Sequence, residues 1–182
     1  MVQHIREWML TYENFTGLNG TVPCSLYSIL YENHMIEDPF YGLNEYKARE
    51  LCEKGCTFTA VFDVEEEMLH NEKLLLRFEG VDTLAEIYIN GKWIGSTKNM
   101  HRIWEFDVKD HVVQGSNAIE VQIHSPMQAA REAASKYPLW GVTHTTVDGY
   151  QHIRKAHYMY GWDWGPQLPD MGIFRDVQLI GY

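Results

Sequence analysis

The clearest local pattern in the chain is the stretch AEIYINGKWIG at residues 85–95. Ile87 and Ile89 alternate with Tyr88, and this period of two is typical of a β-strand with one buried face. Asn90-Gly91 is a pair that a tight type I′ turn prefers, because both central residues of that turn need positive φ angles. The residues KWIG then return as a second strand, so the stretch predicts a β-hairpin.

Further strand patterns lie on both sides of this hairpin. CTFTAVFDV at 56–64 places Phe58, Ala60, Phe62 and Val64 on one face of a strand. The other predicted strands are EKLLLRFEGV (72–81), RIWEFDV (102–108), NAIEVQIHSP (117–126) and GIFRDVQLIGY (172–182). About seven strands joined by turns, with no regular alternation of strand and helix, predict an all-β fold, an antiparallel β-sandwich.

A few short helices accompany the strands. We expect the first fifty residues to be irregular with short helices, one of them from the spacing of Leu26, Ile29 and Leu30 and another between Asn44 as N-cap and Gly55 as stop. SPMQAAREAASKYP, residues 125–138, predicts a third helix, with Pro126 near its start and Pro138 after it. At 182 residues, the chain (1–182) is expected to form a single domain.

The charge and cysteine content exclude several classes of function. A net charge of −10 without clustered Lys and Arg argues against nucleic acid and anionic membranes as partners. We see no signal peptide and no apolar run long enough to span a membrane. Cys24, Cys52 and Cys56 make an odd count, which favours a reducing, cytoplasmic location. The C-x3-C pair lacks a second paired motif, so we expect buried thiols, no metal and no cofactor.

The segment 139–172 is where binding chemistry is expected. It is long and interrupted by glycine and proline, yet rich in aromatic residues, so it should be ordered. Asp163 stands between Trp162 and Trp164. The aspartate either caps a turn or faces a ligand. The rings either fill the end of the sandwich or bind that ligand. Flat rings beside a carboxylate suit a sugar, whose C–H groups pack on the rings and whose hydroxyls donate to the carboxylate.

No catalytic residue is predicted within the chain. A glycosidase needs two carboxyl groups at a set separation, about 5 Å or about 6.5–9.5 Å. The acidic residues fall mostly in turns or at outward strand positions, and no acid/base pair is visible. A G-x-S-x-G nucleophile motif and a phosphate-binding loop are also absent from the sequence.

Four motifs occur in an order and spacing that resemble a known family. VPCSL, IEDPFYGLNE, FEGVDTLAEIYINGKWIGSTKNMHRIWEFDV and RKAHYMYGWDWGPQLPDMGIFRDVQL are similar to the N-terminal domain of β-mannosidases in glycoside hydrolase family 2. The likeness runs from about Trp8 to Leu179. GVDT with IYING, and GIFRDVQL, are shared with β-galactosidases and β-glucuronidases, whereas DPFYGLNE and RKAHYMYGWDWGP point to the mannosidase branch.

The resemblance implies a galactose-binding-domain-like jelly roll that precedes immunoglobulin-like and TIM-barrel domains in the parent enzyme. The catalytic glutamates of a retaining β-mannosidase would then lie on the barrel, and this chain would be a non-catalytic N-terminal fragment. By the same resemblance, Asp163 and Trp162 contact the β-mannoside, Trp164 supports their loop, and Asn99 and Arg102 lie nearby. For Arg154 and Lys155 it leaves two roles open, of which a structural ion pair is favoured over contact with the sugar.

Two other functions fit the same residues. One is a free-standing carbohydrate-binding module, and the other is a purely structural domain that supports a neighbouring domain. The equivalent domain of a β-galactosidase or β-glucuronidase also remains open.

Overall fold

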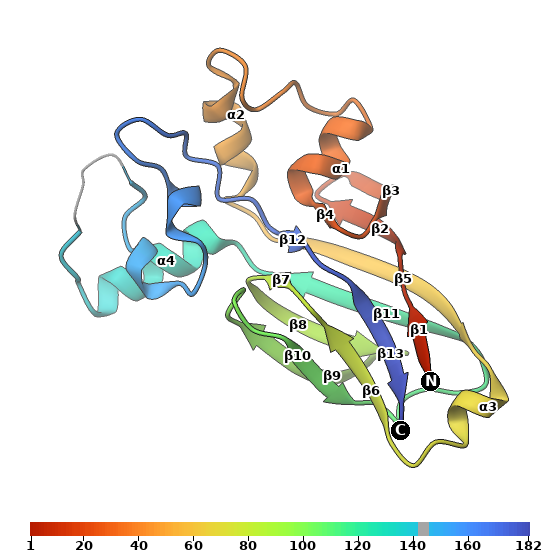
Figure 1. Ribbon diagram of the computed structural model, residues 1–182. Helices are drawn as coiled ribbons and strands as arrows, with labels where there is room; N and C mark the ends of the chain where they lie inside the picture. The colour runs from red at the N-terminus through yellow and green to blue at the C-terminus, as the bar shows by residue number, and fades with distance from the viewer. Residues whose placement is uncertain (142–145) are drawn as a thin grey trace.

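The computed structural model describes residues 1–141 and 146–182, and two antiparallel sheets form its two main layers (Figure 1). The larger sheet has six strands in the order β3 (Phe15–Thr21), β2 (Glu7–Tyr12), β5 (Cys56–Val64), β11 (Gly115–Ile123), β8 (Leu84–Ile89) and β9 (Lys92–Lys98). The other has four, β1 (Val2–His4), β13 (Val177–Gly181), β6 (Leu74–Phe78) and β10 (Trp104–Asp107). The predicted all-β antiparallel sandwich is confirmed.

The core lies between these layers. The inward residues of β5 are Phe58, Ala60, Phe62 and Val64, all buried as their alternation predicts. Leu74, Leu76 and Phe78 of β6 are also completely buried. Each such large side chain contributes about 1.5–3 kcal/mol by leaving water. The hairpin between β8 and β9 turns at Asn90 and Gly91, whose φ angles of 51° and 76° are the predicted positive values.

The first fifty residues contain more sheet than the sequence pattern indicated. The irregular structure expected there is wrong, because β1, β2, β3 and the short strand β4 (Cys24–Ser25) occupy this region. Trp8, Leu10 and Tyr12 of β2 are buried and alternate with less buried neighbours. The sequence of β2 therefore carries the period of two that is typical of a strand. The partner strand β3 is rich in glycine and polar residues, so its composition does not predict a strand. It is a strand because it pairs with β2 in a hairpin.

The predicted final strand is also wrong in its extent. It divides into β12 (Gly172–Ile173) and β13, with Phe174–Asp176 between them. β12 lies in a third, three-stranded sheet between β4 and β7 (Val81–Asp82), whereas β13 lies in the four-stranded sheet. The chain therefore changes sheets within this stretch.

The helices begin close to the predicted places. α1 (Leu26–Glu32) starts with a capping box between Ser25 and Ser28, and α4 (Pro126–Lys136) has Ser125 as its N-cap. α2 (Asn44–Leu51) starts at Asn44 itself and ends before the expected stop at Gly55. α3 (Glu66–Leu69) is a single turn. In the described part of the chain, no helix is long and apolar enough to cross a membrane.

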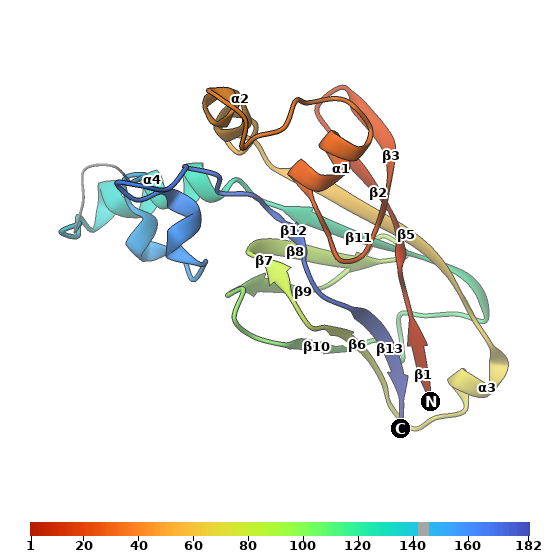
Figure 2. The ribbon, with the colours of Figure 1, turned by 45° about the horizontal axis from the view of Figure 1, so that its top comes forward.

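The segment after α4 lies with that helix at the end of the sandwich away from the two chain termini (Figure 2). It contains two short 3-10 helices, η1 (Tyr150–His152) and η2 (His157–Tyr160), and residues 142–145 of this segment lie outside the described residues. Gly149, which precedes η1, has a φ of 82° and approaches α4 closely. A Cβ added there would lie 2.1 Å from the carbonyl oxygen of Ala130. Only glycine therefore permits this contact.

Replacing Gly149 with alanine should separate the segment from α4. We expect Gly149→Ala to lower the free energy of unfolding by at least about 3 kcal/mol, from the strained φ and the steric clash together. Gly17→Ala is the matched control, because Gly17 has a φ of 70° but open space around its Cβ position. The control should lose only about 1 kcal/mol, from the φ strain. Urea denaturation measures both values, and equal losses would contradict a tight contact at Gly149.

Candidate functional site

The tryptophans of the GWDWGP motif lie on a short closed turn. Gly161 enters it with a φ of 101° and a ψ of 168°, a conformation that is essentially limited to glycine. The backbone N–H of Trp162 then donates to the carbonyl of Gly165 at 3.3 Å, and that of Gly165 donates back to the carbonyl of Trp162 at 3.4 Å. These reciprocal bonds hold the residues between them, Asp163 and Trp164, at the tip. We call Trp162–Gly165 the site turn.

The side chains of the site turn point into solvent. Trp162 is 44% exposed and Trp164 is 84% exposed, and Asp163 is exposed as well. The alternative in which these two rings fill the end of the sandwich is therefore wrong. That role belongs instead to Tyr150 and Tyr160, which are buried. Burial and the nearby charge of Asp82 raise the pKa of Tyr160, which keeps its hydroxyl neutral.

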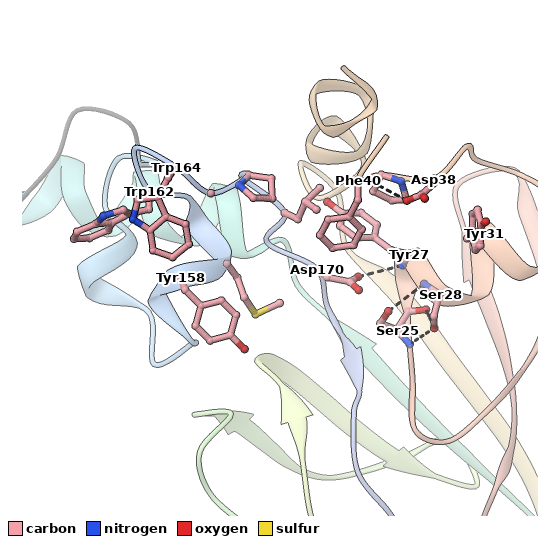
Figure 3. A pocket seen from close by; sticks show the side chains of 15 residues that line it. Ser25, Tyr27, Ser28, Tyr31, Asp38, Phe40, Tyr158, Trp162, Trp164 and Asp170 are labelled. Atoms are coloured by element: carbon pink, nitrogen blue, oxygen red, sulfur yellow. Dashed lines mark hydrogen bonds between the residues drawn. The ribbon is translucent and has the colours of Figure 1, made fainter. Parts of the chain in front are cut away.

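A cavity of about 660 Å³ opens on one side of the site turn. We call it the aromatic cavity. Its lining comes from α1, the 38–40 turn and the segment 158–170, namely Ser25, Tyr27, Ser28, Tyr31, Asp38, Pro39, Phe40, Tyr158, Met159, Trp162, Trp164, Gly165, Pro166, Leu168 and Asp170. Figure 3 shows the tryptophans and Tyr158 on one side, Phe40 and Tyr27 on the other, and Asp170 between them. Its volume falls in the range of small-molecule sites.

A second hollow of about 650 Å³ also borders the site turn. Asp163, Glu45 and Gln167 line it with polar groups, so we call it the polar hollow. Asp163 borders only the polar hollow, whereas Trp162 and Trp164 border both spaces. The site turn thus borders one mainly apolar space and one that also contains polar side chains.

Asn99 and Arg102, the other predicted site residues, line neither of these two spaces. The Asn99 side chain accepts the backbone N–H of His101 at 2.9 Å, and the Arg102 guanidinium lies 5.0 Å from the ring of Trp104. The turn that contains Asn99 and Arg102 still contacts the segment that leads to the site turn. The backbone N–H of Met100 donates to the carbonyl of Arg154 at 3.0 Å. The structure brings the two backbones together but directs these two side chains elsewhere.

Lys155 forms the structural ion pair that the sequence favoured. Its ammonium is completely buried and pairs with the carboxylate of Asp82, which is also buried. The carboxyl pKa of Asp82 is raised by burial and held back by the Lys155 charge. Arg154 is exposed, and its expected ion pair stays a prediction. No sequence pattern pointed to Asp82, because it lies 73 positions before its partner.

Asp170 is a carboxylate at the aromatic cavity that the sequence did not single out. Its Oδ1 accepts the backbone N–H of Tyr27 at 3.1 Å and that of Met171 at 2.8 Å. The Asp170 side chain therefore joins the end of segment 158–170 to the first turn of α1. Burial raises the pKa of Asp170 to about 6, while hydrogen bonds from Ser25, Tyr27 and Met171 act in the opposite direction.

The three cysteines are buried and form no disulfide. Cys52 donates to the Tyr27 hydroxyl at 3.1 Å, and burial raises the pKa of Cys24 to about 12. Such thiols stay protonated near neutral pH and are poor nucleophiles. Within residues 1–141 and 146–182, no group of three or more His, Cys, Asp and Glu side chains could hold a metal ion.

Comparison with known proteins identifies the family. The family model described as the glycosyl hydrolase 2 galactose-binding domain-like domain matches residues 8–175. The chain belongs to this family. Its galactose-binding-like fold agrees with the antiparallel sandwich described above.

Individual relatives of this galactose-binding-like domain carry β-mannosidase names. A β-mannosidase of Bos taurus is 35% identical over 172 residues, which are 91% of this chain and 20% of that protein. A β-mannosidase B of Aspergillus terreus is 34% identical over 88% of this chain and 19% of its own length. The crystal structure of a β-D-mannosidase from Dictyoglomus thermophilum is 37% identical, with a TM-score of 0.93 over 100% of this chain and 23% of that one. The chain thus spans about a fifth of the length of the curated relatives.

The raised pKa of Asp170 should make the stability of the domain depend on pH. Its folded pKa of about 6 exceeds the ordinary value of 3.8, so the folded state binds the proton more tightly than the unfolded state. Protonated Asp170 therefore stabilises the folded state, and this contribution to the free energy of unfolding is complete below about pH 4. It is lost as the pH rises through about 6. Across this window the free energy of unfolding should fall by an amount on the order of 2 kcal/mol in the wild type relative to Asp170→Asn.

Urea denaturation at several values between pH 4 and 7.5 measures this difference. Asp38→Asn is the control, since it removes an exposed carboxylate from the opposite wall of the same cavity. The control should keep the pH dependence of the wild type. Parallel curves for the wild type and Asp170→Asn would show that Asp170 does not titrate in this window.

Proposed function

We propose that this chain is the non-catalytic N-terminal domain of a β-mannosidase-like glycoside hydrolase, and that the site turn forms one wall of its glycone subsite. The observation that carries the proposal is an aspartate between two exposed tryptophans on a turn closed by its own hydrogen bonds. Relatives that are 33–35% identical over 88–91% of the chain and carry β-mannosidase names support the substrate class.

The chemistry of the site turn suits a neutral sugar. The Asp163 carboxylate accepts hydroxyl hydrogen bonds, and the faces of Trp162 and Trp164 pack against sugar C–H groups. This supplies recognition on one side of a sugar and leaves the other side to a second surface. Two carboxyl groups near the site, the buried Asp82 and the half-buried Asp170, already have structural partners. We therefore assign the catalytic acids to a separate TIM-barrel domain.

An exposed apolar surface beside the site supports contact with such a neighbouring domain. Phe40, Tyr41 and Leu43 are 74–77% exposed, and Tyr46 is 51% exposed. They follow α1 or lie on α2. Phe40 and Tyr46 border the polar hollow together with the tryptophans, and Tyr41 and Leu43 border a separate hollow beside residues 37–44. Monomeric domains seldom leave contiguous apolar patches in water, so an additional barrel or immunoglobulin-like domain would cover this one. The three unpaired cysteines favour a cytoplasmic enzyme.

The first test is the activity of the full-length product of the gene that encodes this chain. We expect hydrolysis of p-nitrophenyl β-D-mannoside with a higher kcat/KM than for the corresponding galactoside or glucuronide. The 182-residue chain alone should show no turnover, and calorimetric titration with mannose should give a dissociation constant of about 1 mM or weaker. Micromolar binding by the chain alone would favour the free-standing binding module instead.

The second test removes the Asp163 carboxylate in the full-length protein. Asp163→Ala should lower kcat/KM for the β-mannoside by at least about 30-fold, or ~2 kcal/mol, because a charged acceptor of sugar hydroxyls is lost. Trp164→Ala should also reduce kcat/KM. Trp93→Ala is the control, since Trp93 is 56% exposed on β9 and borders neither the aromatic cavity nor the polar hollow. Wild-type kcat/KM in Asp163→Ala would rule out contact with the sugar.

A further inference from the structure

The site turn belongs to a longer loop whose two ends meet at a single side chain. Lys155 opens the loop and Asp170 closes it, and the ammonium of Lys155 donates to the backbone carbonyl of Asp170. The same ammonium pairs with Asp82 in β7. One buried cation thus closes residues 155–170 and attaches them to the sheet that contains β7. We call 155–170 the site loop and this contact its anchor.

The anchor continues into the sandwich through hydrogen bonds. The Thr83 hydroxyl donates to Oδ1 of Asp82, which leaves Oδ2 for Lys155. The Thr83 carbonyl accepts the hydroxyl of Thr97 in β9 at 2.8 Å. Asp82 also belongs to the three-stranded sheet, where it pairs with Gly172, two residues beyond the end of the site loop. The carboxylate that receives Lys155 is therefore fixed from several directions.

Stability alone does not account for this anchor. The Lys155 side chain is 0% exposed and that of Asp82 is 6% exposed, so both charges have left water. A buried ion pair is often no more stable than an apolar pair of the same volume. What the ion pair adds is direction, because an ammonium offers hydrogen bonds at fixed angles and here uses them on Asp82 and on the Asp170 carbonyl.

We propose that Lys155 and Asp82 are positioning residues that hold the site turn in its binding geometry. They act through the backbone of the site loop, while Trp162 and Asp163 make the contact with the sugar. The inference rests on the proposed function for its biological meaning. Its physical content, anchoring of residues 155–170, can be measured without any activity.

Hydrogen exchange followed by mass spectrometry tests the anchoring on the 182-residue chain. We expect Lys155→Met to raise exchange rates within 155–170 by at least about 10-fold, with β5 and β11 unchanged. Lys109→Met is the matched control, because the Lys109 ammonium also donates to two backbone carbonyls, those of Leu69 and Asn71, in another loop. Its effect should stay near residues 66–73 and leave the site loop protected.

A double variant separates positioning from folding, because Lys155→Met leaves Asp82 buried without its partner. Asp82→Asn with Lys155→Met removes both charges and keeps an acceptor for Thr83. We expect this variant to recover most of the urea midpoint lost in Lys155→Met, yet to keep fast exchange in 155–170. Wild-type protection of the site loop in the double variant would overturn the inference. A uniform rise in exchange across all strands would also overturn it, since the pair would then be merely structural.

Activity then separates this inference from the proposed function. In the full-length protein, the double variant should lower kcat/KM for the β-mannoside by at least about 10-fold, while Lys109→Met keeps the wild-type value. If the wild-type protein hydrolyses no β-mannoside, the proposed function fails but the exchange result still decides the anchoring. If the double variant combines fast exchange with wild-type kcat/KM, the positioning role is refuted and the proposed function stands.

Discussion

The antiparallel ladder between β5 and β11 is the constraint on which the rest of the structure depends. It pairs nine residues of each strand and sets Cys56 opposite Ile123. Because α2 precedes β5 and α4 follows β11, this register brings both helices to the same end of the sandwich. Ser125 then donates to the Cys52 carbonyl at 2.6 Å, which joins the two helix ends directly. A shift of β5 or β11 by one residue would move the buried side chains of that strand to the opposite face and displace the helix joined to it.

The site at that end is assembled from chain segments that are distant in sequence. The first includes α1 and the turn at 38–40, and the second is the turn after β9 at 99–102. The third is the site loop, which contacts both. Asp170 bonds to α1, while Arg154, just before the loop, bonds to Met100. The sandwich thus serves as a support, and the candidate site residues lie on connections between its strands.

The sequence predicted the parts of this arrangement that depend on neighbouring residues. The alternation in β5, the Asn90-Gly91 turn and Pro126 near the start of α4 are all local signals, and the structure has each of them. β3 lacked such a signal because pairing rather than composition makes it a strand. The motif singled out Trp162 and Trp164 as site candidates, and the structure shows both exposed, while their role in binding stays a prediction. The contacts of Lys155, Asp82 and Asp170 join residues far apart in the chain, and no local pattern could reveal them.

The position of Trp162 and Trp164 between two spaces has a consequence for how the domain would respond to a ligand. Each indole is shared by the aromatic cavity and the polar hollow, so a rotation of either ring changes the lining of both spaces. The backbone of the site turn is closed by its own hydrogen bonds and need not move. The two spaces therefore share part of their lining, and a change of side-chain torsion at Trp162 or Trp164 would alter the shape of both while the backbone stays in place.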